Sequence, residues 1–287
     1  MMEHVPPVFI GISLDPPGRI RRTILLARRE VMSKFSSLWF WMVASLLGLM
    51  AYSYGGGFQQ TFQTESVVVT ADPLLGLNTT IVGFLGLVLG LRLACGISWE
   101  REHGTLEVLR AGPVSWLDLL VAKFLAEVAV LGALGAIYVA YLLIAQPLGD
   151  AMIGPEILLP VLGNMAFVLP VMATGLVVSV LAGTVRMAVV MYLSVLCGLC
   201  LYEAVFGLLR AMTVDEMSLF ALYLRAALEA AAPFVRPLSP VSGIALLVDN
   251  AMHQDVPAIG QSMSSLGLTL LLFAAAWLIA RIKGARA

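Results

Sequence analysis

The sequence predicts an all-α, polytopic membrane protein with six transmembrane helices. Of its 287 residues, 60% are hydrophobic and 12% are charged, whereas a soluble domain normally carries about 25% charged residues. Six apolar windows reach or approach the roughly 20 residues that a helix needs to cross a bilayer. Positive charge is distributed unevenly among the segments that connect these windows, and this asymmetry sets the orientation of the chain.

The windows form one transmembrane domain over residues 38–282. An irregular tail rich in proline and glycine (1–18) and one helix precede this domain, and a short cytoplasmic tail (283–287) follows it. The fourth window contains Pro160, Asn164 and Pro170, and a bent helix is expected there because proline removes a backbone donor. In chain order, the six windows cover residues 38–54, 77–97, 119–145, 157–183, 187–212 and 263–282.

Residues 19–37 predict a basic amphipathic helix ahead of the first window. Apolar residues recur there at steps of three and four positions and form one stripe, so we expect the helix to lie in the headgroup plane. The alternative is a charged flank that only enforces orientation. The apolar stripe consists of Ile20, Ile24, Ala27, Val31 and Phe35, and the charged residues away from it are Arg21, Arg22, Arg29 and Glu30.

The charge asymmetry predicts that both termini are cytoplasmic. Lysine and arginine occur in the N-terminal segment, between the second and third windows, between the fourth and fifth, and in the tail, whereas residues 55–73 and 146–155 contain neither. Because positive loops stay in the cytoplasm, we expect a multi-pass protein of a cell membrane, such as the bacterial inner membrane. The net charge of −1 gives no reason to expect a nucleic-acid partner.

A helical cap is expected on the outer face over about residues 213–262. Residues 213–232 have a helical pattern that opens with Thr213 and the acidic pair Asp215 and Glu216, a favourable helix start. Pro233, Pro237 and Pro240 then interrupt the chain before the last window.

A short charged helix is predicted at about residues 99–111, between the second and third windows. Gly104 permits a sharp backbone bend, and the Gly-Pro pair at 112–113 ends the helix. Ser115 followed by Asp118 forms a capping box that starts the third window. From these residues alone, two interpretations remain open: a docking surface for another protein, or a solvated connection with favourable caps.

The same segment resembles a known family. The pattern Glu100-x-Glu102-x-Gly104-Thr105-Leu106-Glu107-x-Leu109-x-x-x-Pro113-Val114-Ser115, followed by Leu120-x-x-x-Lys123, is similar to permease subunits of ATP-binding-cassette exporters of the second export family. The resemblance implies a coupling helix that inserts into a groove of a separate ATPase. The residues that it assigns to coupling are Glu100, Glu102, Gly104, Thr105, Leu106, Glu107 and Leu109.

The resemblance also implies partners. The sequence has no phosphate-binding loop of the Gly-x-x-x-x-Gly-Lys type, so we expect this chain to be no enzyme and to bind no cofactor itself. Two copies of an ATPase would supply ATP and Mg²⁺, and a second permease protomer, identical or paralogous, would complete the pathway. Export of a hydrophobic or amphipathic substrate is expected. The alternative is a non-transporting subunit that relays motion to an extracytoplasmic partner through residues 213–262.

No catalytic constellation or histidine-based metal cluster is visible in the sequence. Cys197 and Cys200 have the spacing of a redox or metal pair. Because no histidine or further cysteine accompanies them, we expect them to be small buried side chains.

Charged residues inside the windows are candidates for a pathway or for a structural role. Glu203 is costly in lipid and therefore a functional candidate, with a hydrogen-bonded structural glutamate as the alternative. Arg92 is expected to extend to the inner headgroups, with a substrate contact as the alternative. Lys123 and Glu127 are four residues apart and are expected to pair on one helix face.

Overall fold

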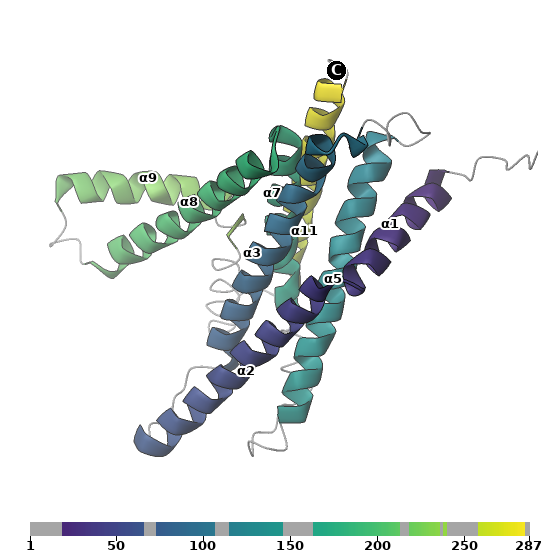
Figure 1. Ribbon diagram of the computed structural model, residues 1–287. Helices are drawn as coiled ribbons and strands as arrows, with labels where there is room; N and C mark the ends of the chain where they lie inside the picture. Colours follow the sequence, from purple (N-terminus) through teal and green to yellow (C-terminus); the bar gives the residue numbers. More distant parts are fainter. Residues whose placement is uncertain are drawn as a thin grey trace, which may run out of the picture.

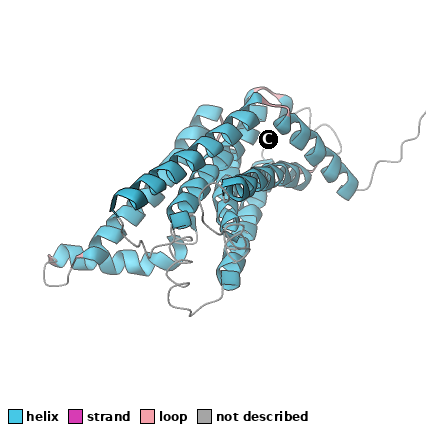
Figure 2. Cartoon of the chain, turned by 90° about the horizontal axis from the view of Figure 1, so that it is seen from below, coloured by secondary structure: helices cyan, strands magenta, loops and turns pink. Residues whose placement is uncertain are grey.

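The computed structural model describes residues 19–65, 73–106, 115–145, 163–212, 218–235, 238–239 and 258–284. These residues form helices and no strand (Figure 2), which confirms the all-α fold. The longer helices are α1 (Arg19–Phe35), α2 (Leu38–Glu65), α3 (Pro73–Glu102), α5 (Trp116–Ala145), α7 (Val168–Leu181), α8 (Val185–Ala211), α9 (Leu219–Val235) and α11 (Ala258–Gly284).

Four of these helices, α3, α5, α8 and α11, are long and apolar enough to cross a membrane. A fifth span results if α1 and α2, which meet at an angle of 63°, are counted as one broken span. The fourth predicted window is represented by a shorter apolar helix, Met165–Leu181, and residues 157–162 lie outside the described part. Within the described residues the structure therefore supports four or five spans, and the total of six stays a prediction.

Helix ends that are far apart in the sequence meet at one end of the bundle (Figure 1). Arg101, at the end of α3, donates a hydrogen bond to the carbonyl of Ala182 between α7 and α8 (2.5 Å). Lys283, at the end of α11, donates to the last carbonyls of α7. Thr23 of α1 donates to Asp118 at the start of α5 (3.2 Å). The start of α1, the α7–α8 connection and the end of α11 therefore lie at the same end of the bundle as the end of α3 and the start of α5.

Local sequence signals account for how the helices begin. The hydroxyl of Ser115 donates to the Asp118 carboxylate (2.6 Å), and the Asp118 amide donates back to that hydroxyl (3.2 Å), which confirms the predicted capping box. A 3₁₀ turn, Met165–Phe167, precedes α7. Pro170 lies in the first turn of α7, where its missing N–H leaves no hydrogen bond unmade. The proline-bearing window therefore starts irregularly.

α3 and α7 approach each other backbone to backbone in the centre of the bundle. A methyl group at Gly175 of α7 would overlap the carbonyl oxygen of Gly90 in α3. A methyl group at Gly90 would in turn overlap the hydroxyl of Tyr192 in α8, which donates to the carbonyl of Gly86 (2.9 Å). Small residues permit such close helix contacts in lipid, where packing drives association. α3 is therefore the helix around which α7 and α8 are arranged.

The apolar core lies among α2, α3, α5, α7 and α11. Leu47, Leu85, Leu134, Leu176 and Ala276, one from each of these helices, are completely buried. These side chains pack on one another and hold the bundle together through close contacts of the kind that stabilise protein interiors.

α8 and α9 lie mostly outside this core. Figure 1 shows α8 diverging from the bundle with α9 beside it, and only 11% of the most apolar stretch of α8 is buried. Cys197 and Cys200 are exposed on α8, so their expected burial is wrong for the single chain, because this part of α8 does not enter the core. Other exposed apolar side chains of the two helices are Leu193, Val195, Leu201, Leu208, Phe220 and Tyr223.

Replacing Gly175 with alanine is expected to destabilise the protein, because the added methyl group pushes α7 away from the α3 backbone. Overpacking of this kind costs about 1–3 kcal/mol. Thermal unfolding of the detergent-solubilised protein measures the effect. Gly132→Ala in α5, where a methyl group meets nothing within 4 Å, is the matched control and should keep the wild-type midpoint. Equal midpoints for all three proteins would contradict the α3–α7 packing.

Candidate functional site

The segment that carries the family motif begins as the last turn of α3. Residues 99–102 belong to α3, so the helix predicted at 99–111 is divided. At Gly104 the backbone φ is 70°, a left-handed conformation that glycine adopts without steric cost. The bend predicted there is confirmed. Thr105 and Leu106 are helical again, whereas Glu107 and Leu109 lie outside the described residues.

Short-range contacts hold this turn in one conformation. The hydroxyl of Thr105 donates to the carbonyl of Glu100 (3.1 Å). The ring of His103 stacks on Trp99, with 4.2 Å between ring centroids. The side chain of Leu106 is buried while Gly104 and Thr105 are exposed. The α3 end therefore presents an ordered polar surface with one apolar anchor.

The end of α3 is also bonded to the connection between α7 and α8. Arg101 donates to the carbonyl of Ala182 (2.5 Å), and the carboxylate of Glu102 accepts from the amide of Val185 (3.0 Å). A cation thus lies at the C-terminal end of α7 and an anion at the N-terminal end of α8, which is the favourable arrangement for both helix dipoles. Glu102, which the resemblance assigns to the ATPase, has a hydrogen-bond partner within its own chain.

A cluster of six charged side chains lies deeper, where α1, α3 and α5 meet. Lys34 lies 2.6 Å from the Glu127 carboxylate, and Lys123 lies 2.7 Å from that of Glu100. Longer contacts complete it: Arg92 to Glu127 at 3.5 Å and Lys123 to Glu30 at 3.8 Å. The charge cluster, as we name it, contains three acids and three bases and is formally neutral: Glu30, Lys34, Arg92, Glu100, Lys123 and Glu127.

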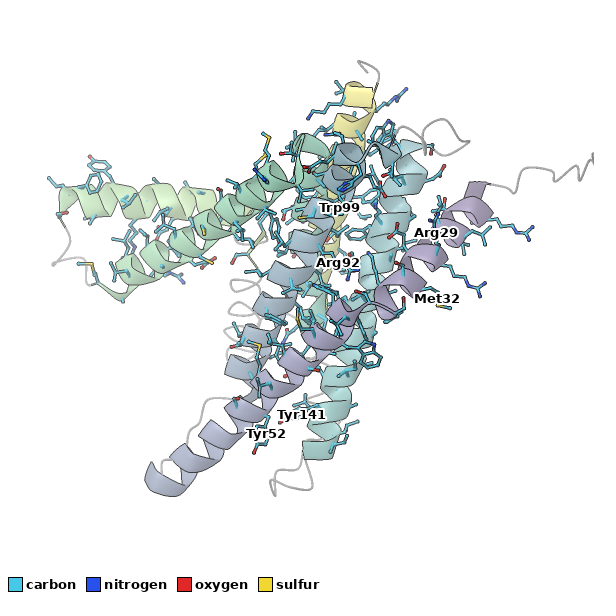
Figure 3. All side chains as sticks on the ribbon, viewed as in Figure 1. Arg29, Met32, Tyr52, Arg92, Trp99 and Tyr141 are labelled. Atoms are coloured by element: carbon cyan, nitrogen blue, oxygen red, sulfur yellow. The ribbon has the colours of Figure 1, made fainter. Side chains whose placement is uncertain are left out.

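One expectation about these charges is corrected. Lys123 does not pair with Glu127. The Glu127 carboxylate pairs with Lys34 and Arg92, and Lys123 pairs with Glu100 and Glu30. The expectation that Arg92 extends to the inner headgroups stays a prediction. Its guanidinium group lies 4.0 Å from the ring centroid of Trp39 as well as beside Glu127, and Figure 3 shows it partway along α3.

Five members of the charge cluster, all except Glu100, line a small cavity of about 150 Å³. Nη1 of Arg92 and Oε2 of Glu127, which is almost fully buried, have no hydrogen-bond partner in the protein. A volume of this size holds several water molecules, and waters usually satisfy such groups. A larger cavity of about 470 Å³ shares Glu30 and Lys123 with it and reaches Thr105. The two cavities share lining residues, so space lined by both charged and apolar side chains lies between the motif segment and Glu127.

A family comparison covers almost the whole chain. Residues 24–281 match the family described as ABC-2 family transporter protein. The chain belongs to the ABC-2 transporter family. No curated protein matches the sequence. Permeases of this family are membrane transport components that are not themselves catalytic, and the ATPase activity lies in a partner. This ABC-2 permease is thus a multi-pass membrane protein of an ABC transporter.

Glu203, the other candidate charge, is separate from the charge cluster. It is half-buried on α8. The hydroxyl of its neighbour Tyr202 donates to the carbonyl of Leu228 in α9 (2.9 Å). Glu203 therefore belongs to the region where α8 and α9 meet, and its role in this ABC-2 permease stays a prediction. In the part of the chain that the structure describes, no three potential metal ligands come together.

Sequence reasoning missed the contribution of the first helix to the site. Glu30 and Lys34 belong to the charge cluster, although the amphipathic pattern places Glu30 on a polar face directed to water. The signal that identifies the buried face is the spacing of Thr23, Ala27, Glu30 and Lys34, which recur every three or four residues. Small and polar residues at that spacing fit a close contact with α5, while Ile20 remains 77% exposed.

Replacing Glu127 with glutamine is expected to destabilise the ABC-2 permease strongly, because Lys34 and Arg92 lose the carboxylate that compensates them. Breaking a buried ion pair from one side costs about 3–5 kcal/mol. Denaturant unfolding in mixed micelles measures the free energy.

The matched control is Glu229→Gln, which removes an exposed carboxylate paired with Arg225 at 3.1 Å. An exposed pair contributes about 0–1 kcal/mol.

The double variant Lys34→Met/Glu127→Leu should be more stable than Glu127→Gln. A Glu127→Gln protein as stable as the control would disprove the structural importance of the charge cluster.

Proposed function

We propose that this permease is the membrane-spanning subunit of an exporter, driven by a separate ATPase that binds at the segment following α3. One observation carries the proposal: the described part of the family motif, residues 100–106, forms a turn at the end of α3 that is bonded to the α7–α8 connection and, through Glu100 and Lys123, to α5. A displacement of this turn acts directly on α3, on the α7–α8 connection and on α5. Packed interiors have low compressibility and transmit such displacements.

The proposed complex contains two ATPase subunits, which use ATP and Mg²⁺, and two permease protomers, identical or paralogous. The exposed apolar surface of α8 supports a second protomer, because large apolar patches rimmed by polar residues mark interaction sites as well as lipid contacts. ATP binding must favour one arrangement of the helices over the other, since only a difference in affinity between two states shifts their populations.

The motif end of the bundle is proposed to face the cytoplasm, in a bacterial inner membrane. Arg101, Arg186, Arg281 and Lys283 all belong to helix ends at this side, and positive residues near span ends stay inside. Both termini are then cytoplasmic, as expected from the sequence.

The proposed substrate is hydrophobic or amphipathic, which the apolar surfaces of α8 and α9 support. The alternative is a non-transporting subunit that relays motion to an extracytoplasmic partner through residues 213–262. Exposed Leu219, Phe220 and Tyr223 on α9 favour a protein contact there. Replacing α9 with a polar helix of equal length separates the two: an exporter retains some transport, whereas a relay loses its partner.

Reversing the charge of Glu107 to lysine is expected to weaken ATPase docking, because the resemblance places this carboxylate at the contact. The measurement is co-purification with a co-expressed ABC ATPase subunit and the stimulation of its ATP hydrolysis by the permease. Loss of one charged contact corresponds to about 2–5 kcal/mol when the pair is buried.

Glu229→Lys, a charge reversal of an exposed α9 residue, serves as the control and should keep full stimulation. Unchanged assembly and stimulation with Glu107→Lys would argue against the coupling assignment.

A further inference from the structure

The connection between α7 and α8 is held by charged side chains from α3 and α11. Arg101 and Glu102 of α3 bond to the carbonyl of Ala182 and the amide of Val185, and Lys283 of α11 bonds to the Leu181 carbonyl (2.6 Å). The backbone is extended at Ala182 (ψ 138°), where α7 ends. The path of the chain therefore changes direction between α7 and α8, and α8 is placed by contacts between side chains, including the packing of Ala188 and Tyr192 on Val171 and Val178 of α7.

A second attachment of α8 lies seven residues further along the helix, at Tyr192. The side chain of Tyr192 is completely buried, and its hydroxyl donates to the carbonyl of Gly86. A methyl group at Gly90 would overlap that hydroxyl, so the tyrosine lies directly on the α3 backbone. α8 is thus fixed to α3 at Val185 and again at Tyr192.

Beyond Tyr192, α8 extends away from the bundle. The two attachments are seven residues apart, about 10 Å, and the helix continues for 19 residues to Ala211, about 28 Å. Phe206 and Leu209 are buried in this overhang, and the hydrogen bond from Tyr202 ties α9 to it. For a rigid helix that pivots at Tyr192, a displacement of Val185 is therefore magnified about threefold at Ala211.

We infer that Arg101 and Glu102 are positioning residues that make α8 and α9 follow the motif end of α3. This inference rests on the proposed function for the source of the motion. It assigns Glu102 to the transmission of ATPase-driven movement and not to the ATPase contact. α3 is itself fixed to α7, because the Ile97 amide donates to the Ser179 hydroxyl (2.9 Å) and Ser98 donates to the Ser179 carbonyl (3.2 Å).

The test measures the orientation of α8 relative to α5. Spin labels at Leu208→Cys on α8 and Leu143→Cys on α5, both exposed sites, report one interhelical distance after the native cysteines are replaced by alanine. The labelled full-length protein is diluted with unlabelled protein in lipid nanodiscs, without and with the ATPase and ATP. The variants are Arg101→Met and Glu102→Ala, with Glu229→Ala as the matched control.

Without the ATPase, we expect the distance distribution to be roughly twofold broader in both variants than in the wild type, because the overhang amplifies the lost attachment. With the ATPase and ATP, the wild-type distance shifts, and the variants lose most of that shift while the ATPase still co-purifies. Glu102→Gln keeps an acceptor for the Val185 amide and should resemble the wild type.

Equal widths and equal shifts in the wild type and both variants would overturn the inference. So would a Glu102→Ala protein that loses the ATPase but keeps a narrow distribution, since Glu102 is then an ATPase contact. If the wild-type protein binds no ATPase, the proposed function is refuted instead. The widths of the distance distributions measured without the ATPase then still show whether Arg101 and Glu102 attach α8 to α3.

Discussion

The arrangement of α1, α3 and α5 depends on the compensation of charge in an apolar surrounding. Lys34 and Glu127 are nearly inaccessible to solvent, and an isolated charge there costs several kcal/mol after relaxation. Each member of the charge cluster must therefore find its counterpart on another helix. The contact between Thr23 and Asp118 and the pair Lys34–Glu127 place α1 parallel to α5 in a single register. The bend of 63° that follows then sets the direction of α2.

α3 connects this polar region with the rest of the molecule. One side of it contributes Arg92 and Glu100 to the charge cluster. Another side provides the glycine surface for α7 and α8, and its last turn holds the α7–α8 connection through Glu102. The same helix leads directly into the motif segment. A displacement of that segment therefore acts on all three contacts at once, which is the property that a coupling element requires.

The sequence predicts what depends on local chemistry. The apolar windows locate α3, α5, α8 and α11, the Ser115–Asp118 box locates the start of α5, and Gly104 locates the bend. Partners across helices are not predictable in this way. Lys123 and Glu127 are neighbours on one helix, yet each finds a closer partner on another helix.

Distance along the chain explains the other differences. The partner of Glu102 is 83 residues away at Val185, and no local pattern reveals that the two meet. The exposure of Cys197 follows from the divergence of α8. Hydropathy does not distinguish a face that contacts lipid from one that contacts protein, because both are equally apolar.

The formal neutrality of the charge cluster has an evolutionary consequence. A substitution that changes the sign of Lys34 alone leaves two like charges facing each other at a nearly solvent-inaccessible site, whereas an exchange of both partners restores the balance. Homologous sequences should therefore vary at positions 34 and 127 in concert, and positions 100 and 123 should do the same. Such paired variation marks residues in contact and would trace the α1–α5 and α3–α5 interfaces through the genomes that encode this permease.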